Sequence, residues 1–377
     1  MSTQPAARSR QAAVAGLRPA YRSELADGTD RFFEPRRTDC PWCGALSLRL
    51  RLRTRDLLQY KPGTFLLDEC GACGHVFQNP RLTEAGLAFY YRDFYDGLGE
   101  QRLGATLGTR RSTYRGRARS VLPFTAAPGR WLDVGTGHGH FCETAREVLP
   151  ATVFDGLDLS EGVELAERHG RVTRGLRGTF PGLAGRMPRH YDVVSMFHYL
   201  EHSTEPDREL AAARQVLCPG GLLLIEVPDP QSRYARLLGR WWLPWLQPQH
   251  LHLAPAANLR RRLGELGFTV LLEQHTEPHD PVDLLAACWL LLDALAPRED
   301  APWRAGRPPG RLRRALRAAV FVAGAPALLL AALADRLLAR VAGPAGLANA
   351  YRLLARKDVD APSRPPVRPG DGAAGLD

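Results

Sequence analysis

Residues Trp131-Leu-Asp-Val-Gly-Thr-Gly-His-Gly-His140 decide the fold, because an apolar strand runs there into a turn in which glycines alternate with single residues. Positions without side chains let a ligand approach the backbone where a strand gives way to a helix. Asp133 precedes the first glycine, and Asp158 ends the next apolar segment. A carboxylate at the second position can accept hydrogen bonds from the ribose hydroxyls of an adenosine. The sequence therefore predicts a nucleotide-type cofactor site.

The glycines follow a Gly-x-Gly-x-Gly spacing, whereas nicotinamide-binding folds usually have Gly-x-Gly-x-x-Gly. With Asp133, this turn resembles motif I of the class I S-adenosylmethionine-dependent methyltransferases. Residues 191–202 resemble that family's fourth strand and following loop, and residues 217–228 its Pro-Gly-Gly turn and fifth strand. Residues 259–270 and 351–357 are similar to the sixth and seventh strand regions. The resemblance covers residues 119–277 and 342–357.

This resemblance implies an α/β fold with a Rossmann-like seven-stranded sheet and S-adenosylmethionine as the cofactor. Near residues 172–175 the chain lacks the acidic residue that many relatives use to hold the adenine amine. We therefore expect backbone groups to contact the adenine. The predicted cofactor-binding residues are Asp133, Gly135, Thr136, Gly137, Gly139, Asp158, Leu159 and Phe197.

Two Cys-x-x-Cys pairs lie upstream, separated by 26 residues. Such pairs can present four thiolates to one tetrahedral zinc ion, which holds a small domain together and leaves no open position for chemistry. We predict a structural zinc in a zinc ribbon, with His75 outside the ligand set. An Asn-Pro-Arg segment and a Tyr-rich stretch follow, as in zinc-ribbon methyltransferases that include deoxysugar C-methyltransferases. Tyr90, Tyr91 and Tyr95 are candidates to line an acceptor pocket, with core packing as the alternative. The predicted zinc ligands are Cys40, Cys43, Cys70 and Cys73.

The loop after the predicted fourth strand contains the candidate catalytic residues. His202 lies at the carboxyl edge of the sheet, where its imidazole would suit a general base, and Glu201 could orient it. A second interpretation is metal-assisted O-methylation by Glu201, His202 and His250. It rests on a resemblance to small-RNA 2′-O-methyltransferases and quinone-biosynthesis O-methyltransferases. In this chain His198 replaces the acidic residue that those relatives have three positions before the Glu-His pair.

The segments outside the expected core are apolar. The aromatic segment Trp241–Trp245 is interpreted as a lid, a glycan platform or a membrane contact, with packing as the alternative. Residues 318–334 contain no charged side chain, have arginines on both sides, and are expected to form a buried or interfacial hairpin. We predict that residues 278–341 form an acceptor-binding cap, with peripheral membrane contact as the alternative.

Composition and charge limit the remaining classes. The net charge of +10 is carried almost wholly by arginine, and no alternating basic and aromatic stripe points to nucleic acid. The N-terminus lacks the apolar region of a secretory signal, and the paired cysteines fit a reducing compartment, so a cytoplasmic location is expected. The expected units are a disordered arm at 1–35, a zinc ribbon at 36–80, a helical connector at 81–118, a methyltransferase core at 119–277, a helical insertion at 278–341, the last core strand at 342–360 and a disordered tail at 361–377.

The functional hypothesis is methyl transfer to a small-molecule or biosynthetic-intermediate acceptor such as a sugar, glycan, lipid or polyketide. In-line displacement requires mainly that donor and acceptor be held in position. The alternatives are an RNA methyltransferase whose ribbon binds RNA, the metal-assisted O-methyltransferase, and a non-catalytic binding or scaffold protein. The acceptor atom and the oligomeric state stay open.

Overall fold

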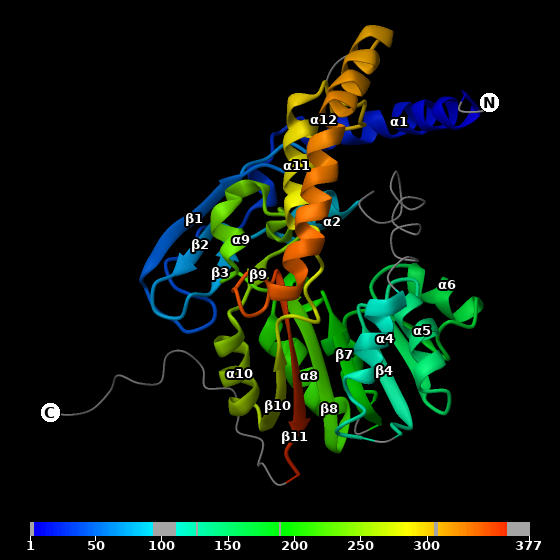
Figure 1. Cartoon of the computed structure of the whole chain (residues 1–377), viewed down its shortest axis with the longest axis vertical. Coiled ribbons are helices and arrows are strands. Elements are labelled where there is room, and N and C mark those ends of the chain that lie inside the picture. Colours follow the sequence, from blue (N-terminus) through cyan, green and yellow to red (C-terminus); the bar gives the residue numbers. More distant parts are fainter. Residues whose placement is uncertain (1–3, 93–110, 126, 188–189, 305–307, 360–377) are drawn as a thin grey trace, which may run out of the picture.

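A twisted seven-stranded sheet in the order β10-β11-β8-β7-β4-β5-β6 organises the computed structural model and lies in the lower half of Figure 1. The structure describes residues 4–92, 111–125, 127–187, 190–304 and 308–359. Strands β4 to β8 run parallel, and β11 is antiparallel to both β8 and β10. The predicted fold class is confirmed. The strands are β4 (Arg130–Val134), β5 (Val153–Asp158), β6 (Gly175–Arg177), β7 (Tyr191–Phe197), β8 (Leu217–Pro228), β10 (Phe268–Gln274) and β11 (Ala350–Lys357).

Both faces of this sheet are buried, which explains why its strands are continuous apolar runs. Successive residues point to opposite faces: Trp131 joins one apolar cluster and Leu132 the other. Leu222 and Leu223 alternate in the same way. One face is covered by α4 (Arg111–Arg119), α5 (His140–Val148) and α6 (Gly162–Arg168), and the other by α7 (Phe180–Ala184), α8 (Pro206–Val216) and α10 (Ala256–Glu265).

A second, four-stranded sheet contains the cysteine pairs and is completed by a strand from the core. Its order is β1-β2-β3-β9, with all pairs antiparallel. The last strand, β9, faces β3 with His252 opposite Phe77. The cysteine-bearing unit is therefore joined to the core by backbone hydrogen bonds. The strands are β1 (Leu48–Thr54), β2 (Phe65–Cys70), β3 (Val76–Gln78) and β9 (His252–Leu253).

The N-terminal arm differs from the prediction of disorder. Residues Gln4–Leu25 form helix α1, and a short turn, Asp30–Phe32, follows it. Tyr21 is fully buried and its ring packs on Phe89 of α2 (Glu84–Tyr91) and on Trp303. A polar, arginine-rich composition concealed this contact, because the few apolar residues that anchor α1 find their partners far along the chain. The predicted tail at 361–377 lies outside the described residues.

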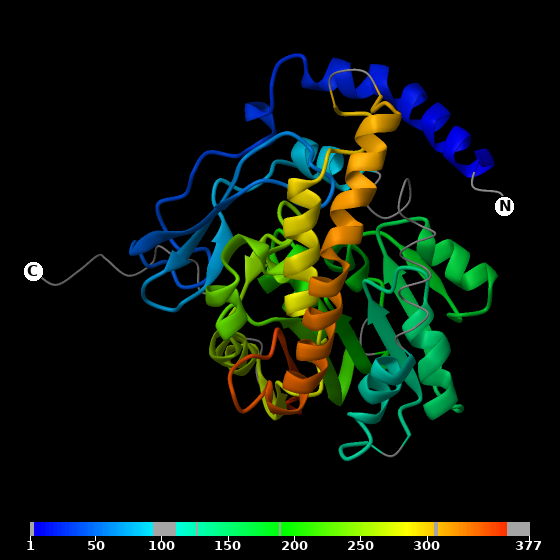
Figure 2. The same ribbon diagram turned by 45° about the horizontal axis from the view of Figure 1, so that its top comes forward.

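The insertion is helical, as predicted, but its apolar run is not a hairpin. Helix α11 (Asp283–Leu295) packs along α12 (Arg311–Leu338), and residues 318–334 lie within α12 alone. Pro326 is inside this helix and does not end it. Figures 1 and 2 show the two helices side by side over one face of the molecule, with the strands of the cysteine-bearing sheet to one side.

Candidate functional site

The glycine turn follows β4 at the carboxyl edge of the sheet. The backbone N–H groups of Gly135 and Thr136 both donate to the carbonyl of Leu157, at 2.8 and 3.1 Å, which folds the turn back over β5. Gly137 has a φ of +52°, and an added Cβ there would meet no atom within 4 Å. Helix α5 begins directly after the turn, at His140. The turn therefore presents open backbone at a helix start, as a nucleotide-type cofactor requires.

Asp158 ends β5 and faces this turn. Its carboxylate accepts hydrogen bonds from the backbone N–H groups of Gly137 (2.9 Å) and Ser160 (2.8 Å). Leu159, beside it, leaves 65 % of its surface exposed. The carboxylate and the open Gly137 thus lie at one place, where the sequence predicts the contact with the ribose.

Asp133 lies below the turn and is buried. It accepts a hydrogen bond of 2.6 Å from the hydroxyl of Ser195, which in turn accepts one from the indole of Trp131. Burial raises the pKa of Asp133 to about 6. Thr136 lies close to the Cys142 thiol, at 3.7 Å, and is also buried. These predicted cofactor residues form the floor of the turn.

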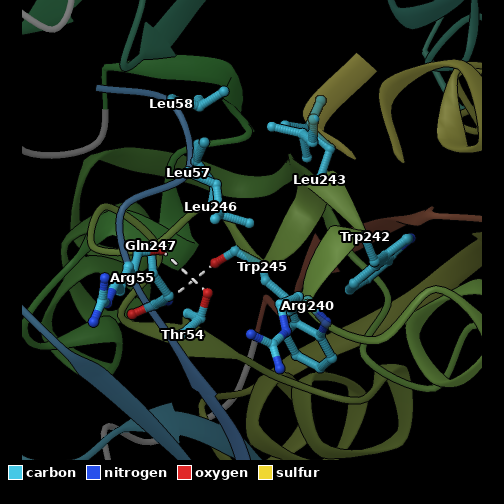
Figure 3. Close-up of a pocket in the computed structure, with 11 residues that line it drawn as sticks. Thr54, Arg55, Leu57, Leu58, Arg240, Trp242, Leu243, Trp245, Leu246 and Gln247 are labelled. Atoms are coloured by element: carbon cyan, nitrogen blue, oxygen red, sulfur yellow. Dashed lines mark hydrogen bonds between the residues drawn. The ribbon is translucent and has the colours of Figure 1, made fainter. Parts of the chain in front are cut away.

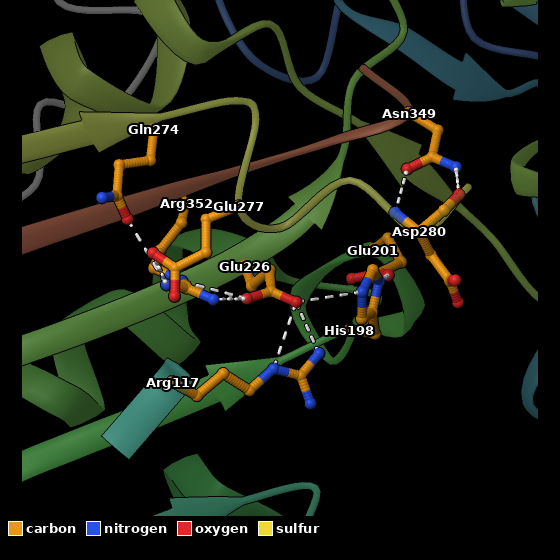
Figure 4. Close-up of polar contacts among 9 residues, drawn as sticks. All are labelled: Arg117, His198, Glu201, Glu226, Gln274, Glu277, Asp280, Asn349 and Arg352. Carbon is orange, nitrogen blue, oxygen red and sulfur yellow. Dashed lines mark hydrogen bonds and ion pairs between the residues drawn. The ribbon is translucent and has the colours of Figure 1, made fainter. Parts of the chain in front are cut away.

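A buried ion network runs from this floor toward β11, and no pattern in the sequence indicates it (Figure 4). Glu226 on β8 accepts hydrogen bonds from Arg117 of α4 and from Arg352 of β11 (2.9 Å). These cations hold the pKa of Glu226 well below its usual range despite burial. The guanidinium of Arg117 also lies 4.4 Å from the ring centre of Phe197, a predicted cofactor residue. In the sequence, the one local sign of this ion network is Glu226 itself, a single charged residue in the apolar run of β8.

His198 belongs to the same network. Its backbone has a φ of +51°, and its ring contacts Glu201 at 3.2 Å and Glu226 at 3.5 Å. Burial opposes protonation, yet these two carboxylates raise the pKa of His198 to about 9. The side chain that replaces the relatives' acidic residue is therefore an imidazolium placed between two carboxylates.

Glu201, His202 and His250 converge although 48 positions separate the last two. One ligand atom from each lies within 4.8 Å of the others, and the Nε2 of His250 is 4.0 Å from a Glu201 oxygen. The second oxygen of Glu201 is buried without a hydrogen-bond partner. The short helical turn Leu200–His202 after β7 presents the first two residues, and the segment before β9 presents the third.

The two imidazoles of this cluster are held by their Nδ1 atoms. Nδ1 of His250 lies 2.7 Å from the carbonyl of Pro244, and Nδ1 of His202 lies 3.1 Å from that of Gln249. A carbonyl only accepts, so each Nδ1 carries the proton and each Nε2 keeps its lone pair. Burial lowers the pKa of His202, and it lowers that of His250 to about 3. Neutral imidazoles oriented in this way, beside a carboxylate oxygen without a partner, fit a divalent cation.

The four predicted zinc ligands form a second group. The sulfurs of Cys40 and Cys73 are 3.8 Å apart, and those of Cys43 and Cys70 are 3.6 Å apart. Four thiolates around one zinc ion at about 2.3 Å would be separated by about 3.8 Å. All four sulfurs lie within 4.8 Å of one another, and His75 is outside the group. A metal-binding group of four cysteines is therefore present, and its geometry fits zinc.

Residues 108–273 match a protein family described as a methyltransferase domain. Residues 108–273 are therefore a methyltransferase domain. Over 153 residues the chain is 31 % identical to the ubiquinone biosynthesis O-methyltransferase of Yersinia pestis. The aligned region covers 38 % of this chain and 62 % of that protein. The enzyme of the same description from Saccharophagus degradans is 27 % identical over 133 residues, or 33 % of this chain and 56 % of that protein. The chain thus spans about six tenths of the length of these curated relatives.

Methyltransferases are also among the solved structures to which the chain is similar. An S-adenosylmethionine-dependent methyltransferase from Archaeoglobus fulgidus matches with a TM-score of 0.42 and 17 % identity, over 72 % of this chain and 99 % of that one. A possible histamine N-methyltransferase from Thermotoga maritima matches with a TM-score of 0.40 and 15 % identity, over 68 % and 97 %.

The aromatic segment Trp241–Trp245 packs the methyltransferase domain against its neighbours. Trp242 and Trp245 are buried in one cluster with Leu67 and Val76 of the cysteine-bearing sheet, and the Trp242 indole donates to Asp283 of α11 at 2.8 Å. The cavity beside them is only about 20 Å³ (Figure 3). The packing alternative therefore describes Trp242 and Trp245, and their burial contradicts a glycan platform or a membrane contact at these two rings.

One tyrosine of the connector reaches the candidate catalytic cluster of the methyltransferase domain. The hydroxyl of Tyr91 lies 2.8 Å from Nδ1 of His202 and donates to the carbonyl of Gln249 at 3.0 Å. Tyr90 is buried and bonds the carbonyl of Pro62, so it is a packing residue. Tyr95 lies outside the described residues. The connector thus helps to orient the imidazole of His202.

Proposed function

We propose that this chain transfers the methyl group of S-adenosylmethionine to a hydroxyl oxygen of a small-molecule acceptor placed beside Glu201, His202 and His250. The observation that supports the proposal is the convergence of these side chains, with ligand atoms within 4.8 Å of one another, at the carboxyl edge of β7. Strand β7 adjoins β4, which leads into the glycine turn. Its curated relatives carry the name O-methyltransferase, which agrees with an oxygen acceptor.

The residues around the turn would hold the cofactor. S-adenosylmethionine supplies an electrophilic methyl group on a sulfonium when it is bound. Asp158 would exchange its hydrogen bond to Gly137 for the ribose hydroxyls, and Gly137 leaves the space that a close approach requires. The ring of Phe197 lies over the same edge, packed on Phe141 with 4.7 Å between ring centres. This rigid floor serves to fix the donor, since in-line displacement depends chiefly on position.

On the acceptor side, the cluster would hold a divalent cation. Glu201 would offer a carboxylate oxygen, and His202 and His250 would offer Nε2 lone pairs fixed by their Nδ1 hydrogen bonds. A cation there would lower the pKa of the acceptor hydroxyl, whose proton would pass to solvent as the oxygen takes the methyl group and the sulfonium becomes the thioether of the demethylated cofactor. The other role considered for His202, that of a general base, uses the same Nε2 lone pair. One nitrogen cannot bind a cation and accept the proton at the same time, so the two roles can be separated by experiment.

The test compares the zinc-loaded full chain with Glu201→Gln and His250→Asn. Calorimetry should show S-adenosylmethionine binding in all three proteins, and Mn²⁺ binding, followed by electron paramagnetic resonance, in the wild type alone. Formation of the demethylated cofactor with a panel of hydroxylated small molecules should fall at least hundredfold in both variants. Full turnover in Glu201→Gln together with loss of turnover in His202→Ala would contradict the cation role and favour the base.

Two outcomes would overturn the proposal as a whole. Absence of S-adenosylmethionine binding at millimolar concentration would favour a scaffold protein. Methylation of RNA, with tight and steeply salt-dependent binding, would place the acceptor in a different class.

A further inference from the structure

Helix α12 carries an exposed apolar surface that the methyltransferase domain does not use. The segment Arg311–Val341 is long and apolar enough to cross a membrane, with a mean hydropathy of 2.0 in its most apolar 18-residue window. Only 6 % of that window is buried. Two other kinds of helix have such a hydropathy: the buried core helices of soluble proteins, and signal sequences, which lie near the N-terminus. This helix is exposed and lies near the other end of the chain.

One side of α12 packs against α11. A Cβ added at Gly324 would lie 2.4 Å from a methyl carbon of Leu292, so the two helices touch closely there. Arg317 pairs with Asp293 of α11. Asp335 accepts hydrogen bonds from two backbone N–H groups in the first turn of α11. Positions 317, 324 and 335 recur at helical spacing, so they form one stripe along α12.

The other side of α12 is apolar and exposed. At 100° per residue, its large side chains lie opposite the stripe that faces α11, within an arc of about 140°. Leu312 is 82 % exposed, Val322 is 74 % exposed and Leu329 is 73 % exposed. An unbroken apolar face of this length on a helix surface marks a docking surface. We call it the outer face; its residues are Leu312, Leu316, Val322, Leu329, Leu330, Leu333 and Leu337.

Arginines lie at both ends of this face. Arg311, Arg313 and Arg314 are exposed in the first turn of α12, and Arg336 and Arg340 are exposed near its end. Arg313 and Arg314 line, with Glu299, Asp300 and Arg317, a cavity of about 390 Å³ on the side of α12 that carries Arg317. Arg311, Arg336 and Arg340 are the arginines closest to the outer face. Cations at both ends of an apolar helical face complement a surface that is apolar inside and bears phosphates outside.

The contacts of α12 determine how it can meet such a surface. To span a bilayer it would have to withdraw the buried carboxylate of Asp335 from α11 and expose the close contact at Gly324. Helix α11 has 13 residues, about 20 Å, which is too short to cross with it. The outer face, in contrast, can enter a bilayer surface without breaking any contact to α11.

We infer that the outer face of α12 docks on an anionic lipid bilayer, with the helix lying along the surface and its arginines bound to lipid phosphates. This inference does not rest on the proposed methyl transfer. It does define where the methyltransferase domain would work: next to a membrane, with α11 and the Trp242 contact joining the docked helix to the segment that bears His250.

The test is co-sedimentation of the full chain with vesicles of phosphatidylcholine alone and with vesicles containing a third phosphatidylglycerol. The wild type should bind the anionic vesicles, weakly bind the neutral ones, and be released by molar salt. The double variant Val322→Glu/Leu329→Glu should lose binding at least tenfold, and Arg336→Gln/Arg340→Gln, which removes two exposed arginines beside the outer face, should lose it about tenfold for the anionic vesicles only. Leu50→Glu, at an exposed leucine of β1, is the matched control and should bind as the wild type.

Unchanged melting temperature and S-adenosylmethionine affinity in the variants would show that the fold is intact. Any of the following results would overturn the inference: no binding of the wild type to either vesicle; wild-type binding by the Val322/Leu329 variant; or a wild-type dimer, seen by light scattering, that this variant dissociates. The last result would mean that a second copy of the chain covers the outer face. Retention on the membrane after alkaline carbonate would show that α12 spans it, which also contradicts surface docking.

Discussion

Substituting Gly137 by alanine separates a cofactor site from an ordinary turn. Its φ of +52° is a left-handed conformation, which costs alanine about 1–2 kcal/mol. No atom of the chain lies within 4 Å of the added Cβ, so the protein itself raises no clash. Gly220 has the same properties, with a φ of +74° and open space, but it lies at the amino end of β8, on the opposite edge of the sheet. Gly220→Ala is therefore a matched control.

Both variants should lose about 1–2 kcal/mol of unfolding free energy in urea. Only Gly137→Ala should lose affinity for S-adenosylmethionine, because its Cβ would occupy space that the bound cofactor needs. Crowding by one methyl group costs about 1–3 kcal/mol, which corresponds to a rise in Kd of about 5- to 150-fold. Isothermal calorimetry measures this Kd for S-adenosylmethionine. Wild-type affinity in Gly137→Ala, together with the expected loss of stability, would refute the assignment of this turn to the cofactor.

Three further outcomes are expected. Asp158→Ala should lower S-adenosylmethionine affinity at least hundredfold by calorimetry, whereas Asp192→Ala, which also removes an acceptor of two backbone N–H groups, should lower stability alone. Cys70→Ser should reduce zinc content below one ion per chain by elemental analysis, whereas Cys288→Ser, outside the four-cysteine group, should not. Burial raises the pKa of Glu209 from 4.5 to about 7, so the contribution of this carboxyl to stability is full below pH 4.5 and is lost as the pH rises through 7. The unfolding free energy of the wild type should therefore decline between pH 5 and pH 8, and Glu209→Gln should remove up to about 3 kcal/mol of that decline, as measured by urea titrations at the two pH values.

Local patterns in the sequence were enough for the central sheet and the metal-binding cysteines. Continuous apolar strands, the Gly135 turn and the cysteine spacing each depend on neighbours within a few positions, and the structure has each in its predicted place. Glu201 and His202 are adjacent in the chain. That His250 joins them followed from the resemblance to metal-assisted relatives and could not come from spacing. The roles of these three residues, and of the predicted cofactor residues, stay predictions.

The features that sequence reasoning missed depend on partners far along the chain. Glu226 meets Arg117 and Arg352, which lie 109 and 126 positions away, and no periodicity marks a pair of that kind. Helix α1 was taken for disorder because Tyr21 finds Trp303 only in the folded chain. Residues 318–334 were taken for a hairpin because Gly324 and Pro326 suggest a break. Gly324 instead allows close contact with α11, and the helix continues through both.

The acceptor side of the site joins units that the sequence separates by long intervals. Strand β9 pairs with β3 of the cysteine-bearing sheet, and it begins two residues after His250. The carbonyl of Gln249 orients His202, and Tyr91 of the connector donates a hydrogen bond to the same carbonyl. Loss of metal from the four cysteines should therefore displace His250 through β3 and β9, while Asp158 and the glycine turn at the other end of the site keep their geometry. The Cys70→Ser variant, which needs no chelator, should accordingly bind Mn²⁺ more weakly at the cluster and keep its affinity for S-adenosylmethionine. Equal loss of both would mean that the metal supports the whole fold rather than the acceptor side.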